Sequence, residues 1–455
     1  MSRVKFYHPH FSINIFSTSK LESLLSLGVI WVLTGTVLFP HLVIGSIGLG
    51  LDDACALLLS IVFLYILLLK PKNFLFKGNL MLITMLWAFL LVTGIVFSIF
   101  GGLFHINQFR VPTEMWQYVK RMLFFYSTCY VSYRCLVSPA NFYRCLIYVL
   151  LIAFIVGIFQ ILPWSIGDQL SSLYARSEAQ LLNTEKSFTY LRNYGIAGGA
   201  TAWGGFAMFG VAVSLGMLLA TRKEQGEKRF HRFQLWSVLV LALINALVSG
   251  SRVALAAILA VYLVSVLIGI FLSRHKLRFF LQYVGVSILL GIGFGYALWE
   301  KLFFIVFRYE DLIDKLGGER VNQTEVALSL LKNGQDWLLG VGNVTQRTLA
   351  TSFGTEVEPV YLLVNYGIMG VALRYCLLLV IFIFALRQLN RSVKVERGFA
   401  IASVLALIGY SVFSLGYFFY QELYVGMLPW LLFGWIVGAY CRYNSRVLVP
   451  TTIQH

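Results

Sequence analysis

Charged side chains are scarce in this chain of 455 residues, and acidic ones are scarcer still. Charged residues make up 12% of the sequence, with 36 Lys and Arg against 20 Asp and Glu, whereas hydrophobic residues make up 59%. So little charge excludes a soluble globular protein of this length. Apolar stretches of about 18 or more residues recur along the chain, and a helix needs that length to cross a bilayer. The composition therefore predicts an all-α polytopic membrane protein.

The sequence also lacks the motifs by which enzymes bind nucleotides and metal ions. It has no Walker loop, and no acidic pair is arranged for a metal ion and a nucleotide sugar. Residues 340–342 read Gly-Val-Gly, but they follow no strand and open no helix, so they do not predict a dinucleotide loop. The six cysteines lie in or beside apolar runs without paired spacing. We therefore expect no metal and no cofactor, and the energy for any reaction must come with the substrate.

About twelve apolar runs are long enough to be transmembrane helices. They occupy residues 24–44, 54–69, 79–100, 119–137, 145–163, 196–219, 235–250, 253–272, 281–299, 359–385, 399–417 and 424–441. Alternate connections are strongly basic, namely residues 70–77, 221–232, 273–278 and 387–397. Basic connections stay in the cytoplasm, so both termini are predicted to be cytoplasmic. The net charge of +16 thus reflects orientation in the membrane and not a nucleic-acid partner.

One long polar interval, residues 301–358, falls on the outer face in this topology. It divides the chain into predicted helices within 1–300, an outer cap at 301–358, and further helices with a cytoplasmic tail at 359–455. Within the cap, residues 319–333 have the apolar periodicity of an amphipathic helix that ends at Asn333-Gly334. Polar loops of this length tend to be functional. We therefore expect the cap to serve a substrate.

Arginines in the outer segments are the candidates for holding that substrate. Arg308, Arg320 and Arg347 lie in the cap, and Arg176 lies in the outer loop between the fifth and sixth spans. A guanidinium offers a fork of donors that matches phosphate and other oxygen-rich groups.

A second set of residues is expected to converge at the outer ends of three spans. Arg192 precedes the sixth span, Arg252 lies in the turn between the seventh and eighth, and Glu356 and Glu358 precede the tenth. Two guanidiniums at the membrane edge suit a lipid-linked diphosphate, and a carboxylate beside it could accept the proton of an attacking hydroxyl. The alternatives are that Arg252 only extends toward water and that the two acids only cap a helix.

Five other charged residues have more than one interpretation. Lys120 and Arg121 stand at the outer end of the fourth span, where they could contact lipid phosphates or extend toward water. Asp52 and Asp53 are interpreted as helix caps. Arg374 lies well inside the tenth span, where either helix carbonyls or an acid could be its partner.

Four motifs taken together resemble a known family. They are Arg192-x-x-Gly195 before a span, Ser249-Gly250-Ser251-Arg252 at a helix start, the cap sequence 325–342, and residues 361–370 after the cap, which begin with Tyr361. In this order and spacing the chain resembles the O-antigen polymerases and ligases, bacterial membrane glycosyltransferases that share a ligase-type core. The resemblance covers about residues 190–380, and the first 180 residues match only as a run of spans.

The resemblance implies about twelve helices, a periplasmic cap over a cavity, and an undecaprenyl-diphosphate-linked sugar donor handled without metal at the inner membrane. It implies that Arg192 and Arg252 bind the donor diphosphate and that Tyr361 belongs to the substrate site. The ligases carry a histidine at the position of Glu356, but no histidine occurs between His275 and His455. This departure favours a polymerase.

We therefore expect a polymerase that transfers a growing glycan from its lipid diphosphate to a new lipid-linked repeat unit, as in lipopolysaccharide biosynthesis. A ligase that acts on lipid A core, a flippase for lipid-linked oligosaccharide, and a channel or receptor are the alternatives. A flippase should show internal repeats and a charged midplane cavity, and the sequence shows no repeat. The expected partners are the lipid-linked oligosaccharide, membrane lipids and a chain-length regulator, with no nucleic acid.

Overall fold

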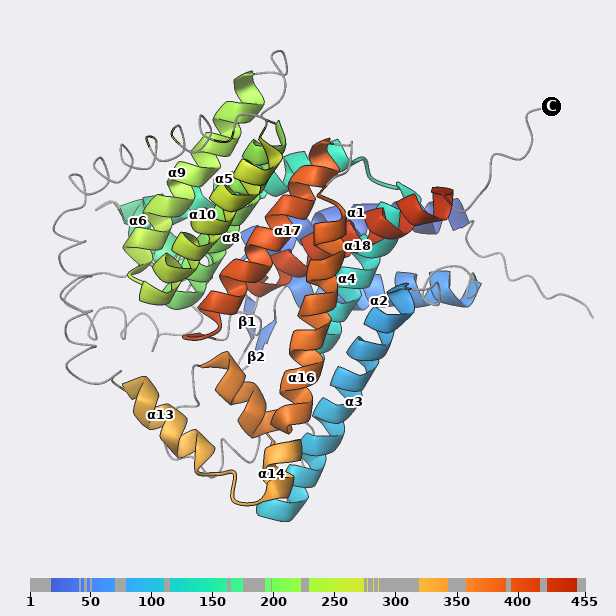
Figure 1. Cartoon of the computed structure of the whole chain (residues 1–455), viewed down its shortest axis with the longest axis vertical. Coiled ribbons are helices and arrows are strands. Elements are labelled where there is room, and N and C mark those ends of the chain that lie inside the picture. Colours follow the sequence, from blue (N-terminus) through green and yellow to red (C-terminus); the bar gives the residue numbers. More distant parts are fainter. Residues whose placement is uncertain are drawn as a thin grey trace, which may run out of the picture.

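The computed structural model describes most of the predicted helices and part of the cap (Figure 1). The described residues are 18–40, 42–44, 47–49, 51–69, 79–109, 115–161, 165–174, 193–197, 199–221, 229–273, 276, 281, 285, 319–342, 357–389, 394–417 and 424–447. The elements in the first half are α1 Thr18–Leu38, β1 Leu42–Ile44, β2 Ile47–Leu49, α2 Leu51–Leu69, α3 Asn79–His105, α4 Met115–Arg134, α5 Pro139–Phe159, α6 Ser165–Tyr174 and α8 Ala200–Thr221. Those in the second half are α9 Arg229–Ser249, α10 Arg252–Leu272, α13 Glu319–Leu328, α14 Gly334–Leu339, α16 Glu358–Arg387, α17 Lys394–Phe413, the 3₁₀ helix η2 Tyr424–Met427 and α18 Leu428–Val447.

The chain is a membrane-embedded and almost entirely helical protein. Within the described residues, seven helices are long and apolar enough to cross a membrane, namely α3, α5, α8, α9, α10, α16 and α17. Helices α1, α2, α4 and α18 lie at four more of the predicted positions. The ninth predicted span, 281–299, lies almost wholly outside the described residues. The number of membrane crossings therefore stays a prediction.

Helices α8 and α17 form the centre of the bundle. The described part of α8 is buried nearly all round, as expected for a helix that is apolar on every face. A side chain at Gly216 would overlap the backbone of Ala402, so glycine lets α8 and α17 approach closely. Close backbone approach through small residues is a common way to pack helices inside a membrane, where lipid removes the hydrophobic driving force.

Helices α4 and α18 pack in the same way through a pair of glycines four residues apart. A β-carbon at Gly434 would overlap the carbonyl oxygen of Phe125, and one at Gly438 would overlap that of Cys129. This is the small-xxx-small spacing that brings helix backbones together in membranes. It fixes α4, which carries much of the charge described below, against α18.

Peripheral helices turn large apolar side chains outward. Leu259, Leu263 and Leu267 of α10 follow one another every four residues, and each is more than half exposed. A stripe of this kind would be unfavourable in water, whereas a lipid surface covers it without cost. The described exterior therefore supports the membrane character expected from composition.

After α1, strands β1 and β2 form an antiparallel pair with Leu42 opposite Leu49. One local prediction, for residues 319–333, was wrong. The amphipathic helix expected at 319–333 ends earlier, because α13 stops at Leu328. Asn333 does not end a helix. It begins α14, since its side chain accepts from the Asp336 backbone N–H and the Asp336 carboxylate reaches back in a capping box.

Helix α16 was expected to be one straight span, but it folds back on itself at Gly367. The backbone there has φ 62° and ψ −172°, which is outside the helical region and suits only glycine. A straight helix would place the Cα atoms of Glu358 and Arg374 about 24 Å apart, yet their side chains meet at 3.7 Å. We call residues 358–366 the short arm and residues 368–387 the long arm. The turn between them lies beside α14 and the end of α3 (Figure 1).

Replacing Gly434 by alanine tests the α4–α18 packing. The added β-carbon has no space, and overpacking of this kind costs about 1–3 kcal/mol of stability, so we expect a lower thermal unfolding midpoint in detergent. Gly334→Ala is the matched control, because a β-carbon at Gly334 meets nothing within 4 Å. A Gly434→Ala midpoint equal to or above that of the control would contradict the close approach of the two helices.

Candidate functional site

The turn of α16 is held by the segment that follows α14. The Val341 N–H donates to the Val364 carbonyl at 2.7 Å, and the Gly342 N–H donates to the Asn365 carbonyl at 3.2 Å. These bonds satisfy carbonyls at the end of the short arm, which the break at Gly367 leaves without helical partners. A side chain at Gly340 would overlap the Asn365 backbone, and its φ of 75° also favours glycine. Residues 340–342 thus hold the turn of α16 in place.

The last helical turn of α3 also contacts α14 and holds it in position. The His105 Nε2 lies 3.1 Å from Asp336 Oδ1, and the other oxygen of this buried carboxylate accepts from the Lys332 and Asn333 N–H groups. The same carboxylate therefore caps α14 and connects it to α3. The cap segments and the turn of α16 consequently form one packed unit.

A buried ion pair joins the two arms of α16. Glu358 Oε1 lies 3.7 Å from Arg374 Nη2, and both side chains are almost fully buried. The N-cap position belongs to Val357. Glu358 therefore lies one residue inside the helix, and the interpretation of this residue as a cap was wrong. Of the two partners left open for Arg374, the acid is the one observed. Breaking a buried pair leaves an uncompensated charge, which is strongly destabilising.

A second ion pair joins α4 to α2, with its lysine buried and its aspartate partly exposed. Lys120 Nζ is 2.7 Å from Asp53 Oδ1, and the Trp116 indole N–H donates to the same oxygen at 3.0 Å. Lys120 and Arg121 are both completely buried, so the expectation that they reach lipid phosphates or water was wrong. Asp53 pairs with Lys120, so capping alone does not account for it. The side chain of Asp52 is outside the described residues.

Aromatic rings connect these charges. The Arg121 and Arg374 guanidiniums lie 5.4 and 5.7 Å from the centre of the Tyr118 ring, and Arg374 also lies 5.1 Å from the Trp430 ring. Both guanidiniums also attract the Glu358 carboxylate. We call Asp53, Lys120, Arg121, Glu358 and Arg374 the buried charge cluster.

The motif after Arg192 packs directly on the turn that carries Arg252. The Asn193 N–H donates to the Val248 carbonyl at 3.3 Å, and the Asn193 side chain accepts from the Gly195 N–H at 2.8 Å. The Asn193 side chain also donates to the Gly157 carbonyl at 2.6 Å. These bonds hold the backbone beyond Arg192 against the end of α9.

Asn245 provides the polar centre beneath this junction. Its side-chain oxygen accepts from the Trp203 indole N–H at 3.1 Å, and its amide donates to the Phe154 and Leu241 carbonyls at 3.1 and 2.8 Å. Gly195, with φ 51°, rests against the Trp203 ring. A buried amide with every group satisfied fixes one arrangement of the surrounding helices.

The turn before Arg252 is built by two serines and a glycine. Gly250 has φ 62°, the Ser249 hydroxyl accepts from the Ser251 N–H at 3.2 Å, and the Ser251 hydroxyl caps α10 by accepting from the Ala254 N–H at 3.3 Å. Arg252 is the first residue of α10 and is partly exposed. Arg252 therefore stands at the positive end of a long helix, where anions are favoured.

The Arg252 turn and the short arm of α16 meet the same end of the bundle. On α8, Gly204 lies against Ser251, and one turn further along Met208 lies against Gly409 of α17. Because α17 runs opposite to α8, the level of Ser251 corresponds to the end of α17 near residue 413. The residue that follows, Ser414, accepts a 3.0 Å hydrogen bond from the Glu358 N–H. Arg252 and Glu358 therefore lie toward the same end of the bundle, and the convergence of these residues with Arg192 and Glu356 in one site stays a prediction.

The other predicted site residues are only partly described. Tyr361 is buried in the hydrophobic core, and its carbonyl accepts from the Asn365 side chain at 2.8 Å. The backbone of Arg320 lies in α13, but its side chain is outside the described residues. The remaining candidates lie outside the described residues, namely Arg176, Arg192, Arg308, Arg347 and Glu356.

Comparisons with known proteins assign no family to this arrangement. No family model matches the chain, and no curated protein matches it. Within the described ranges, His, Cys, Asp and Glu side chains form no group of three that could hold a metal ion.

Substitutions at the ion pair of α16 test how much the pair contributes to stability, compared with the effect of leaving one charge buried alone. Glu358→Gln leaves Arg374 and Arg121 buried without this counter-charge, so we expect a loss of about 3–5 kcal/mol in stability, read as a large fall in the thermal midpoint. Adding Arg374→Met should restore part of it, because the double variant removes one of the two cations that lose this counter-charge. Glu325→Gln, at an exposed acid of α13, is the control. Equal midpoints for Glu358→Gln and the control would show that the pair does not hold the arms together.

Proposed function

We propose that this protein polymerises undecaprenyl-diphosphate-linked oligosaccharide repeat units at the periplasmic face of a bacterial inner membrane. It would be a metal-independent integral-membrane glycosyltransferase of the O-antigen polymerase type. The supporting sequence features are the four family-like motifs and the acid in place of the ligase histidine.

One structural observation carries the proposal. The segment after Arg192 is hydrogen-bonded to the end of α9, four residues before Arg252 begins α10. This contact supports the prediction that two guanidiniums lie together at one end of the bundle. Such a pair matches the oxygens of a diphosphate, and the N-terminus of α10 adds to the attraction.

The reaction follows from the chemistry of the two substrates. A hydroxyl of the acceptor sugar attacks the anomeric carbon of the donor's first sugar, and the bond from that carbon to the diphosphate oxygen breaks. The new glycosidic bond joins the growing glycan to the lipid-linked unit, and undecaprenyl diphosphate leaves. Arg192 and Arg252 would stabilise the charge that develops on the leaving diphosphate. The hydroxyl proton passes to a base.

Glu356 is the better candidate for that base. Glu358 is buried and paired with Arg374, so its carboxylate has a structural partner. We therefore assign Glu358 a positioning role, in which its ion pair and its bond to Ser414 fix the start of the short arm. Glu356 comes two residues earlier in the sequence, so the contacts that hold Glu358 would also determine where Glu356 lies in space. Loss of a general base costs roughly 100- to 10,000-fold in rate.

The sugar chain itself would meet the cap. Arg176, Arg308, Arg320 and Arg347 remain our candidates for contacts with the glycan or its phosphates. Helices α13 and α14 lie beside the turn of α16 (Figure 1). This position supports a cap that covers the substrate next to the short arm. A chain-length regulator would contact the same outer face.

Complementation of a deletion strain tests the activity. We expect the deletion to leave lipid A core with a single repeat unit and no ladder, whereas loss of all glycan on core would indicate a ligase and overturn the proposal. Arg252→Ala should fail to restore the ladder, and Arg252→Lys should restore little, because lysine keeps the charge but loses the fork. Arg144→Ala, at an exposed arginine at the start of α5, is the control. A full ladder from Arg252→Ala at wild-type abundance would show that the residue is structural.

Labelling of single cysteines tests the orientation. Gln335 of α14 is exposed, and we place it outside, so Gln335→Cys should react with a membrane-impermeant thiol reagent in whole cells. Gly226 lies in a basic connection that we place in the cytoplasm, so Gly226→Cys should react only after the membrane is opened. The reverse pattern would move the proposed chemistry to the cytoplasm and exclude this function.

A further inference from the structure

The exposed face of α3 stays apolar as far as the end of the helix near His105. Helix α3 contains no Asp, Glu, Lys or Arg. Its exposed face carries a stripe of large apolar side chains at helical spacing, namely Leu82, Met85, Phe89, Val92, Phe100 and Leu103. From Leu82 to Leu103 the helix rises about 32 Å, and a hydrocarbon core is about 30 Å thick. The stripe therefore spans one bilayer and places the end of α3 at a membrane boundary.

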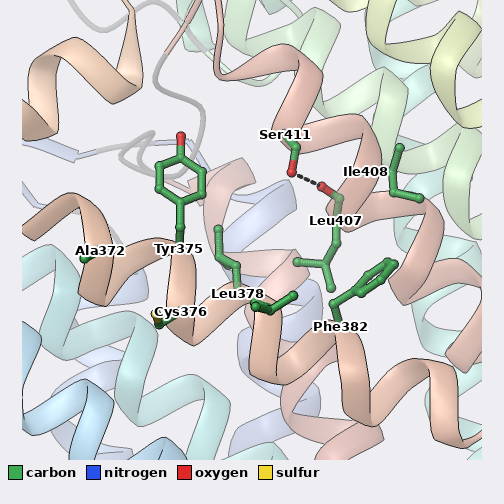
Figure 2. Close-up of a pocket in the computed structure, with 9 residues that line it drawn as sticks. Ala372, Tyr375, Cys376, Leu378, Phe382, Leu407, Ile408 and Ser411 are labelled. Atoms are coloured by element: carbon green, nitrogen blue, oxygen red, sulfur yellow. Dashed lines mark hydrogen bonds between the residues drawn. The ribbon is translucent and has the colours of Figure 1, made fainter.

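The long arm of α16 carries a matching stripe. Exposed residues follow one another there every three or four positions, namely Ile368, Ala372, Cys376, Leu379, Ile383 and Leu386. The surface beside them, between the long arm and α17, is also lined mainly by apolar side chains (Figure 2). From Ile368 to Leu386 the helix rises about 27 Å, so this stripe also spans about one hydrocarbon core. It ends beside the turn at Gly367.

Helix α14 joins the two stripes where they end. His105 Nε2 at the end of α3 lies 3.1 Å from Asp336 Oδ1 of α14, and a β-carbon at Gly367 would overlap the Leu338 carbonyl oxygen. Helix α14 therefore contacts the end of α3 and the start of the long arm (Figure 1). Because each stripe ends where its helix meets α14, both helices place α14 at the same edge of the hydrocarbon core.

The exposed side chains of α14 suit this position. Trp337 and Leu338 are both exposed, whereas Asp336 is buried and forms the contacts described above. A patch of exposed apolar side chains is unusual on a surface that faces water. Tryptophan is instead enriched where lipid headgroups meet acyl chains. Gln335 lies about 200° around the helix from Trp337, and it is also exposed, so the opposite side of α14 is polar.

We propose that α14 is an interfacial helix, with Trp337 and Leu338 inserted among the phospholipids of the leaflet at this end. In the orientation proposed above, this is the outer leaflet. The lipid-facing stripes of α3 and of the long arm continue into this contact, so membrane lipid is the partner that the surface fits. The contact requires no assumption about the reaction. It would hold the cap segments at the membrane surface and, through residues 340–342, set the depth of the short arm.

Photocrosslinking from α14 tests this contact on the full-length protein in vesicles of phosphatidylethanolamine and phosphatidylglycerol. One variant carries Trp337→p-benzoylphenylalanine, an aromatic replacement at an exposed position, and the matched control carries the same photoreactive residue at Gln335. We expect phospholipid adducts from position 337, detected by mass spectrometry, and about tenfold fewer from position 335, because that side of the helix faces water. The same replacement at Leu267, on the lipid-facing stripe of α10, gives the yield for full lipid contact.

A lipid-adduct yield at position 337 no higher than at position 335 would overturn the proposal. A crosslinked dimer in place of lipid adducts would also overturn it, since a second copy would then cover this surface. Quenching of tryptophan emission by brominated phospholipid gives a second measurement without a bulky probe. The quenched fraction should be smaller in Trp337→Phe than in the wild type, and an unchanged fraction would count against lipid contact. Neither measurement needs turnover, so failure of the polymerase assignment would leave both results unaffected.

Discussion

The ion pair between Glu358 and Arg374 is the interaction on which the arrangement of α16, α13 and α14 depends. It lies in a region where an isolated charge would be very unfavourable, so each partner constrains the other. The two residues are sixteen positions apart in one helix, and they can meet only if the helix turns back at Gly367. This turn leaves carbonyls at the end of the short arm without helical hydrogen bonds, and N–H groups within residues 340–342 donate to them. The position of the cap segments is thus coupled to a charge pair within the bundle.

This coupling suggests that the buried charge cluster determines the position of the chain and does not serve only to stabilise the fold. Replacing a buried ion pair by apolar side chains is often neutral or stabilising, so stability is a weak reason for its presence. The pair of α16 and the pair of Lys120 with Asp53 connect the start of the short arm to α4 and α2. The Tyr118 ring contacts both Arg374 and Arg121, so it connects the pair of α16 to the residue next to Lys120 on α4. We infer that the cluster fixes where the chain leaves the bundle toward the cap.

The positions of the helices could be predicted from the sequence, because apolar length and basic connections are local signals. Eleven of the twelve predicted spans coincide with described helices, and α10 begins at Arg252 as the turn before it indicated. The turn at Gly367 could not be predicted, since a single glycine within an apolar run is common in membrane helices. The burial of Lys120 and Arg121 could not be predicted either, because it depends on Asp53 and Glu358, which come from distant parts of the chain. A signal was present: two adjacent cations at the outer end of a span oppose the positive-inside trend.

The same reasoning separates the two acids before the long arm. The sequence alone slightly favours Glu356 as the base, because it lies where the ligases carry a histidine, and Glu358 as a cap, because it adjoins Pro359. The structure distinguishes them through the partners of Glu358, whose carboxylate meets Arg374 and whose N–H donates to Ser414. A general base must reach the hydroxyl of the acceptor sugar, whereas the Glu358 carboxylate is buried and lies against Arg374. Within the proposed reaction, the burial of Glu358 therefore argues that the proton goes to Glu356.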